Sequence, residues 1–193
     1  MKTHVQVAVI GGGVVGCSVL YHLTKLGWSD VCLIERSELT SGSTWHAAGG
    51  FHTLNADPNM ASLQGYTIKL YKELEALTGL NCGLHHVGGI TLADSPERMD
   101  FIKAARAMHR HMGLDTHIIS PEEIKKLSPI VNTQGILGAL YDPLDGHLDP
   151  SGTTHAYAKA AQIQGAEIYL RNPVTDLKQR PDGSWDITTK NGM

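Results

Sequence analysis

The sequence has 193 residues, which is enough for one hydrophobic core but not for a nucleotide-binding domain together with a complete catalytic domain. Its 41% hydrophobic and 18% charged residues are typical of a globular protein, and no apolar run approaches the roughly 20 residues that a membrane span needs. The formal net charge of -3, without a basic patch, argues against nucleic acid, so we expect neither a nucleic-acid nor a membrane partner.

The chain begins with a strand–turn–helix–strand pattern. Residues 5–10 are apolar and β-branched, which predicts a buried parallel strand. This strand begins too close to the start for a leader peptide, so we expect a cytoplasmic protein. Residues 14–26 carry apolar side chains at helical spacing, and residues 31–34 form a second apolar strand. The succession is typical of a βαβ unit, whereas residues 38–51 show neither a helical nor a strand period.

The rest of the chain alternates helices with strands. Ser or Asp followed by Pro marks three helix starts, and periodicity marks one further helix: 61–78, from 96, from 121, and 150–164. Apolar runs between turn signals predict strands over 86–93, 135–141 and 166–170, then a hairpin of 174–180 and 184–189. An Asn-Gly turn signal at 191–192 should lead into another strand, which predicts that the sequence is a fragment.

A glycine-rich fingerprint lies at the first strand–helix junction. Gly11, Gly13 and Gly16 satisfy the G-x-G-x-x-G pattern, which predicts a tight turn, a close backbone approach to a pyrophosphate and close helix–sheet packing. Glu35 ends the second strand, where its carboxylate can accept hydrogen bonds from a ribose and disfavours the 2′-phosphate of NADP. Because the fingerprint fits NAD as well as FAD, an NAD-dependent dehydrogenase remains an alternative.

The segment after the second strand favours FAD over NAD. An NAD domain would continue with a second crossover helix, whereas residues 40–50 are, apart from Trp45, small, hydroxyl-bearing or glycine residues around His46. Such a segment can follow an extended cofactor and offer it N–H and O–H donors.

These residues also carry a family resemblance. The run from Gly42 to Gly49 and the later motif from Asp145 to Pro150 resemble the dimethylglycine and sarcosine dehydrogenase family, FAD-dependent amine oxidoreductases of the glycine/D-amino acid oxidase type. The resemblance extends over nearly the whole chain, which would be the amino-terminal fragment of such a protein. The segment that follows Gly50, Phe51-His52, departs from the mammalian pattern and leaves the identity of the substrate open.

The resemblance implies a cofactor site. The histidine that corresponds to His46 carries FAD covalently through its 8α-methyl carbon, although in other relatives a histidine only hydrogen-bonds a noncovalent FAD. The remaining residues that the resemblance assigns to the cofactor are Val14, Val15, Glu35, Arg36, Gly42, Ser43, Thr44, Trp45, Ala47, Ala48, Gly49, Gly50 and Val174.

The expected fold is α/β, with a Rossmann-like FAD-binding domain and part of an inserted β-rich substrate domain. Residues 1–80 and 149–193 would form the FAD-binding domain, incomplete at its carboxy end. Residues 81–148 would belong to the substrate domain.

The resemblance implies an FAD-dependent enzyme that acts on CH–NH bonds by oxidative N-demethylation of a small N-methyl amino acid, of the dimethylglycine or sarcosine type. A hydride would pass to the flavin, and electron-transfer flavoprotein or oxygen would be the electron acceptor. Tetrahydrofolate would bind in a carboxy-terminal region beyond this chain. Substrate-side catalytic residues are expected beyond Met193, and this chain alone is expected to be inactive. A catalytically inactive flavin-binding fragment is therefore a second alternative.

No metal site is predicted. His85 with His86, and His109 with His111, lack the spacing of a helical zinc site and a completing set of ligands. The acidic residues between 142 and 149 are expected to be structural, and the three cysteines to be buried core residues.

Overall fold

The computed structural model describes residues 2–53, 55 and 57–192. They form two compact units, which we describe separately. Unit 1 comprises Met1–Gly49, Tyr71–Gly83 and Asp149–Met193, and unit 2 comprises Gly50–Leu70 and Leu84–Leu148.

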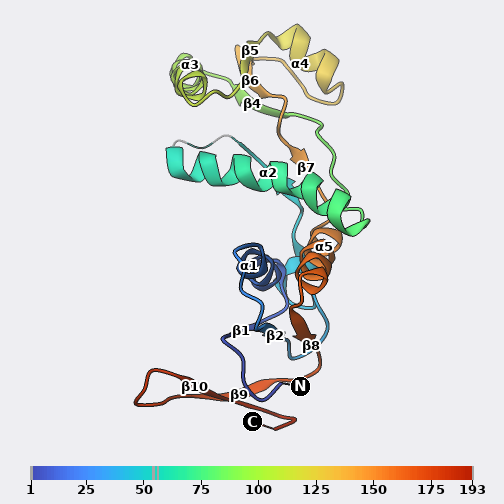
Figure 1. The fold of residues 1–193 in the computed structure, drawn as a ribbon. Helices are drawn as coiled ribbons and strands as arrows, with labels where there is room; N and C mark the ends of the chain where they lie inside the picture. Colours follow the sequence, from blue (N-terminus) through green and yellow to red (C-terminus); the bar gives the residue numbers. More distant parts are fainter. Residues whose placement is uncertain (1, 54, 56, 193) are drawn as a thin grey trace. The chain divides into compact units, whose positions relative to one another are not determined.

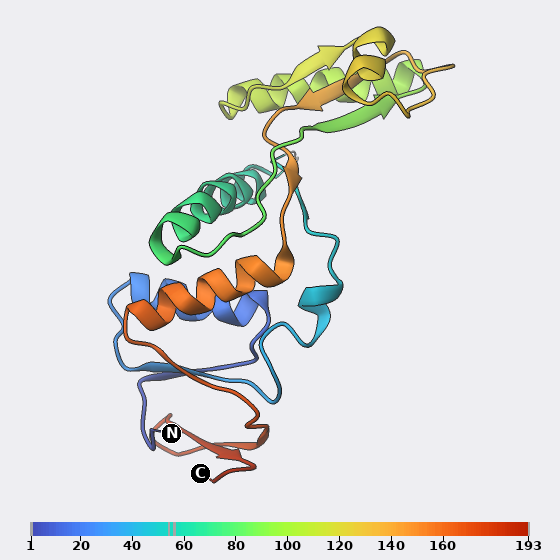
Figure 2. The same ribbon diagram turned by 90° about the vertical axis from the view of Figure 1, so that its right-hand side faces the viewer.

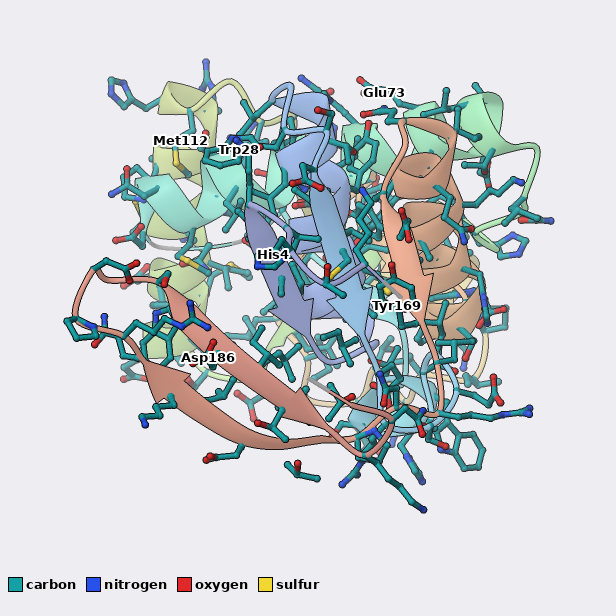
Figure 3. The ribbon with its side chains drawn as sticks, turned by 60° about the horizontal axis from the view of Figure 1, so that its bottom comes forward. His4, Trp28, Glu73, Met112, Tyr169 and Asp186 are labelled. Atoms are coloured by element: carbon teal, nitrogen blue, oxygen red, sulfur yellow. The ribbon has the colours of Figure 1, made fainter. Side chains whose placement is uncertain are left out.

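Unit 1 contains a parallel sheet of β1 (Val7–Ile10), β2 (Val31–Ile34) and β8 (Glu167–Tyr169), in the order β1-β2-β8. All four residues of β2, the middle strand, are buried. Figure 3 shows the three strands side by side, with Tyr169 labelled on β8. The apolar run of residues 31–34 is therefore explained by a position between two neighbouring strands. By contrast, β1 was predicted to be buried, but it ends the strand order and its residues are half-buried or exposed.

Two helices, α1 (Val14–Lys25) and α5 (Pro150–Ile163), lie side by side on one face of this sheet (Figures 1 and 2). The buried residues of α1 are Cys17, Leu20, Tyr21 and Thr24, which recur at the spacing of one helix face. The buried face of α5 is rich in alanine, and small side chains allow two helices to pack closely.

A hairpin lies on the other face of the sheet (Figures 1 and 3). Its strands are β9 (Val174–Gln179) and β10 (Trp185–Thr189), which carries the labelled Asp186. A cavity of about 750 Å³ lies between the hairpin and the sheet, lined among others by Val7, Ile34 and Trp185.

Unit 2 is built on an antiparallel sheet, in the order β4-β6-β5: β4 (Gly89–Ala93), β5 (His117–Ile119) and β6 (Gly138–Asp142). Leu140 packs with residues of α3 (Pro96–His111), whereas its neighbour Ala139 packs with Ile124 of α4 (Pro121–Leu127). Successive side chains of a strand point to opposite faces, so the two helices cover opposite faces of this sheet.

Four further elements complete the described part of the chain. Short β3 (Gly50–Phe51) and β7 (Gly146–His147) form an antiparallel pair in unit 2. The helix α2 (Pro58–Thr78) begins in unit 2, and its residues from Tyr71 onward belong to unit 1. A 3₁₀ turn, η1 (Ser43–His46), belongs to unit 1.

The fold class is the predicted one, and every helix and strand predicted within the described residues is present. The bounds of β2 and the starts of α1, α3, α4 and α5 match the predicted ones, whereas several other bounds are shifted. Three strands of two or three residues, β3, β5 and β7, were not predicted, nor was η1. Such short elements contain no complete hydrophobic period, so the sequence pattern carries no signal for them.

The boundaries of the units differ from the predicted division at two places. Residues 50–70 pack in unit 2 rather than with residues 1–49, because Phe51 pairs with Gly146 and the N–H of Thr53 donates to Asp145 at 3.0 Å. Residues 81–83 pack in unit 1, where the N–H of Cys82 donates to Glu75 at 2.7 Å.

Candidate cofactor site

The glycine turn between β1 and α1, residues 11–16, brings the backbone after β1 close to the first turn of α1. Gly11 has a φ of +109°, which side chains other than hydrogen disfavour. A Cβ at Gly16 would lie 1.9 Å from the carbonyl oxygen of Gly11. The first turn of α1 therefore packs against the end of β1 only because Gly16 has no side chain.

Glu35, which directly follows β2, forms a hydrogen bond with this turn. Its carboxylate is buried and accepts two backbone hydrogen bonds, from the N–H of Gly12 at 2.6 Å and from the N–H of Ser37 at 2.7 Å. Each carboxylate oxygen has a second lone pair, so these bonds leave acceptor sites for ribose hydroxyls. The sequence predicted a ribose contact for Glu35, and the structure adds a role in positioning the glycine turn.

Gly12, Leu39 and Thr40 also shape the site, and of these only Thr40 lies in the segment, residues 40–50, that was predicted to follow the cofactor. A Cβ at Gly12 would lie 2.7 Å from Cδ2 of Leu39, and the N–H of Thr40 donates to the carbonyl of Gly12 at 3.0 Å. Thr40 itself has a φ of +68°. For Gly12, the only signal in the sequence was that three glycines are adjacent, because the G-x-G-x-x-G pattern allows any residue at its second position.

The turn η1 contacts the N-terminus of α1 through a hydrogen bond. Thr44 Oγ1 accepts a hydrogen bond of 3.0 Å from the N–H of Val14, the first residue of α1. The helix N-cap, Gly13, has no side chain and offers the N–H groups of the first turn no side-chain acceptor. In Figure 2, η1 is the short cyan turn to the right of α1 and α5. The segment that the sequence assigned to a cofactor thus adjoins the helix end that binds pyrophosphate in dinucleotide domains.

His46 ends η1 with an exposed ring. Its Nδ1 lies 3.1 Å from the carbonyl oxygen of Gly42, and its ring centroid lies 4.2 Å from that of Trp45. A carbonyl oxygen only accepts hydrogen bonds, so Nδ1 carries the proton in the neutral ring. The other nitrogen, Nε2, then has a free lone pair.

The thiols are poor competitors for such a nucleophilic role. Burial raises the pKa of Cys17 to about 12, and that of Cys82 to about 11. Burial likewise raises the pKa of Cys32. Since the thiolate is the reactive form, all three cysteines remain unreactive thiols at neutral pH.

The chain before Val174 runs beside the end of β2. The N–H of Arg171 donates to the carbonyl of Ser37, and the N–H of Asn172 to that of Glu35, both at 3.0 Å. Val174 begins β9 directly after this contact, on the same unit as the glycine turn.

The remaining predicted positions lie in or near the loop. Arg36 is exposed next to Glu35, and Gly49 has a φ of +75°. Unit 1 therefore brings together the glycine turn, Glu35, the loop from Gly42 to Gly49 and the segment before Val174, whereas Gly50 belongs to unit 2.

Within residues 2–53, 55 and 57–192, no group of three or more His, Cys, Asp or Glu side chains is placed to hold a metal ion. In that same part of the chain, no helix has the length and apolar character for crossing a bilayer.

Comparison with known proteins identifies the family. The chain is 44% identical over 191 residues to the mitochondrial dimethylglycine dehydrogenase of Rattus norvegicus, a match that covers 99% of this chain and 22% of that protein. It is 41% identical over 174 residues to the mitochondrial sarcosine dehydrogenase of Homo sapiens, covering 90% of this chain and 19% of that protein. The chain therefore spans about a fifth of the length of these relatives.

A solved structure agrees with these matches. The crystal structure of L-proline dehydrogenase from P. horikoshii superimposes with a TM-score of 0.91 at 25% identity, covering 100% of this chain and 50% of that one. Residues 6–193 match the family model described as FAD dependent oxidoreductase. The resemblance to dimethylglycine and sarcosine dehydrogenases is thus confirmed, and the chain belongs to the FAD-dependent oxidoreductase family.

Proposed function

We propose that unit 1 binds FAD and that the chain contributes this site to an amine oxidoreductase. The reaction would be oxidative N-demethylation of a small N-methyl amino acid of the dimethylglycine or sarcosine type. The observation that supports it best is the assembly of the glycine turn, Glu35 and the loop from Gly42 to Gly49 within a single compact unit. The identity to dimethylglycine and sarcosine dehydrogenases supports the substrate class.

The residues of unit 1 fit the dinucleotide part of FAD. The close approach at Gly16 presents the first turn of α1 to the pyrophosphate, whose negative charge the helix N-terminus favours. Glu35 accepts hydrogen bonds from ribose hydroxyls, and Arg36 and Val174 lie at the same end of the sheet, toward the adenosine part. When bound, FAD supplies the two-electron acceptor for a hydride from the N-methyl carbon.

His46 is our proposed site of covalent attachment. Its ring is exposed, its Nδ1 is committed to the carbonyl of Gly42, and its Nε2 is free to form a bond. The raised pKa values of the cysteine thiols argue against attachment through sulfur. A histidine that only hydrogen-bonds a noncovalent FAD is the alternative.

The remaining partners follow from the same proposal. Unit 2 would contribute part of the substrate domain, and electron-transfer flavoprotein or oxygen would accept the electrons. Tetrahydrofolate would bind outside these 193 residues. The cytoplasmic location expected from the sequence stays a prediction, while the names of the rat and human relatives place those proteins in mitochondria.

The activity can be tested with protein expressed from the complete gene. Under anaerobic conditions, sarcosine or dimethylglycine should bleach the flavin absorbance, whereas glycine, which has no N-methyl group, should not. NADH formation without flavin bleaching would contradict the proposal and support the NAD-dependent alternative. A flavin that no N-methyl amino acid reduces would support the inactive flavin-binding alternative.

The tether is tested separately by acid denaturation. We expect flavin fluorescence to remain with the wild-type polypeptide on a denaturing gel and to be lost in His46→Ala. His155→Ala is the matched control, because His155 is an exposed histidine on α5 of the same unit. Release of all FAD from the wild type would favour the noncovalent alternative, and retained flavin in His46→Ala would assign the attachment to another residue.

A further inference from the structure

Thr44 links the helix that faces the cofactor to the turn that carries His46. Its Oγ1 accepts the N–H of Val14 at 3.0 Å across thirty residues of sequence. An added Cβ at Gly13 would lie 3.0 Å from the same oxygen, so the hydroxyl sits directly against the N-cap of α1. Thr44 thus satisfies, from a distant segment, one of the otherwise unpaired N–H groups at the start of α1, where the N-cap Gly13 has no side chain.

The turn around Thr44 is short and internally bonded. The N–H of Ala47 donates to the carbonyl of Thr44 at 3.1 Å, and Trp45 donates to Thr40 at 3.4 Å. The ring of His46 is held by the carbonyl of Gly42 at 3.1 Å. Because Thr44 and His46 are two residues apart in one 3₁₀ turn, a displacement of Thr44 also displaces the imidazole.

The β-branched side chain of Thr44 strengthens this link. Threonine has restricted χ1 rotamers, so its hydroxyl has a defined direction relative to the backbone of η1. The hydrogen bond to Val14 therefore fixes the turn in orientation as well as in position.

We propose that Thr44 is a positioning residue for flavin attachment: its hydroxyl fixes η1 on α1 and so aims Nε2 of His46 at the dinucleotide that α1 binds. This inference rests on the proposed FAD function. Attachment joins Nε2 to the 8α carbon, and the carbon and the imidazole each give up one proton. The two electrons of the broken C–H bond pass through the flavin to dioxygen, which becomes hydrogen peroxide.

The hydrogen bond between Val14 and Thr44 should affect the position of the His46 ring more than it affects the affinity for FAD. A misplacement of about 1 Å can slow a reaction about 100-fold. By contrast, the bond to Val14 occupies one of the several N–H groups at the α1 N-terminus, so its loss leaves most of the pyrophosphate site intact. Thr44→Ala should therefore slow attachment far more than it weakens FAD binding.

The test measures both quantities. We expect Thr44→Ala to slow covalent incorporation into apoprotein at least about 10-fold, and Thr44→Ser, which keeps the hydroxyl, to restore most of the rate. Ser29→Ala removes an exposed hydroxyl of the same unit outside the proposed site, and it should match the wild type. Noncovalent affinity is measured in the His46→Ala background, where adding Thr44→Ala should change the Kd for FAD less than about 3-fold.

Two results would overturn the inference: wild-type incorporation by Thr44→Ala, or a loss of affinity as large as the loss of rate. A wild type that releases all its FAD would instead contradict the proposed tether. In that case the His46 imidazole ¹⁵N resonances of apoprotein decide. They should change in Thr44→Ala but not in Thr44→Ser or Ser29→Ala, and unchanged resonances in Thr44→Ala would overturn the positioning role.

Discussion

Gly16 and Gly65 both lie in helices, but the space that a side chain would occupy is filled at Gly16 and open at Gly65. Gly16 lies in the first turn of α1, where a Cβ would meet the carbonyl oxygen of Gly11 at 1.9 Å, whereas nothing lies within 4 Å of a Cβ at Gly65 in α2. In an open helical position, Gly→Ala is stabilising by about 0.5–1 kcal/mol. The same substitution therefore has opposite expected signs at the two positions.

We predict that Gly16→Ala lowers the free energy of unfolding by about 3 kcal/mol through overpacking. Gly65→Ala should raise it by about 0.5–1 kcal/mol through helix propensity. Urea denaturation of both apoproteins measures these differences. A Gly16→Ala variant as stable as the wild type would show that the close approach between α1 and β1 is not maintained in solution.

Glu35 provides a second test at this scale, because it both holds the glycine turn and faces the proposed ribose. A hydrogen bond to a charged group contributes about 1.5–3 kcal/mol, so Glu35→Ala should lower the free energy of unfolding of the apoprotein by about 3 kcal/mol. The Kd for FAD should rise about 10- to 150-fold.

Glu38→Ala is the control for Glu35. Glu38 is exposed, and its ion pair with Arg171 at 2.5 Å is of the surface kind, so its loss should change stability by less than about 1 kcal/mol. Denaturant curves and an FAD titration of both variants measure the effects. If Glu35→Ala behaves like Glu38→Ala, the carboxylate of Glu35 neither organises the turn nor contacts the cofactor.

At the residue scale, the sequence predicted those positions whose chemistry follows from local pattern. Gly11, Gly13 and Gly16 follow β1 at the start of α1, and Glu35 directly follows β2. Their meeting therefore follows from the strand–helix–strand order. The bond between Thr44 and Val14 could not be predicted in the same way. It depends on the path of an aperiodic loop, which neither periodicity nor capping rules describe.

At the element scale, helix starts were the most predictable feature. Ser95 Oγ accepts the N–H of Arg98 at 3.2 Å, and Ser120 forms a capping box with Glu123. These contacts lie within four residues of sequence, so the local pattern determines them. The strands β5 and β7 depend on partners that are distant in sequence, and they are too short to carry a period of their own.

Helix α3 contains a buried histidine whose titration should be visible in stability. His109 is buried, and its Nδ1 lies 3.3 Å from Oγ1 of Thr116. Burial lowers the pKa of His109 below the ordinary 6.5, and the negative charges of Asp142 and Asp145 partly oppose that shift. The unfolded state then binds the proton more tightly than the folded state. Stability from neutral His109 is therefore fully present above about pH 6.5 and is lost as the pH falls toward the lowered pKa.

We expect the free energy of unfolding to fall between pH 7.5 and pH 5 by less in His109→Gln than in the wild type. The matched control is His111→Gln, because His111 is exposed at the end of the same helix. This control should retain the wild-type pH dependence. Urea denaturation at several pH values measures the slopes, and equal slopes in His109→Gln and the wild type would contradict the burial argument.

At the scale of the whole molecule, three separate segments of the chain form unit 1 and two form unit 2. The sequence predicted an inserted substrate domain that includes residues 81–148. It did not anticipate that residues 50–70 pack in unit 2, since that assignment depends on the pairing of β3 with β7. The function proposed for unit 1 needs only residues of that unit, apart from Gly50.

The central claim is that unit 1 binds FAD rather than NAD. Titration of the apoprotein with FAD, followed by flavin fluorescence and repeated in the presence of excess NAD⁺, tests it most directly. The account predicts saturable FAD binding that NAD⁺ does not displace. Displacement of FAD by NAD⁺, or binding of NAD⁺ without any binding of FAD, would contradict it.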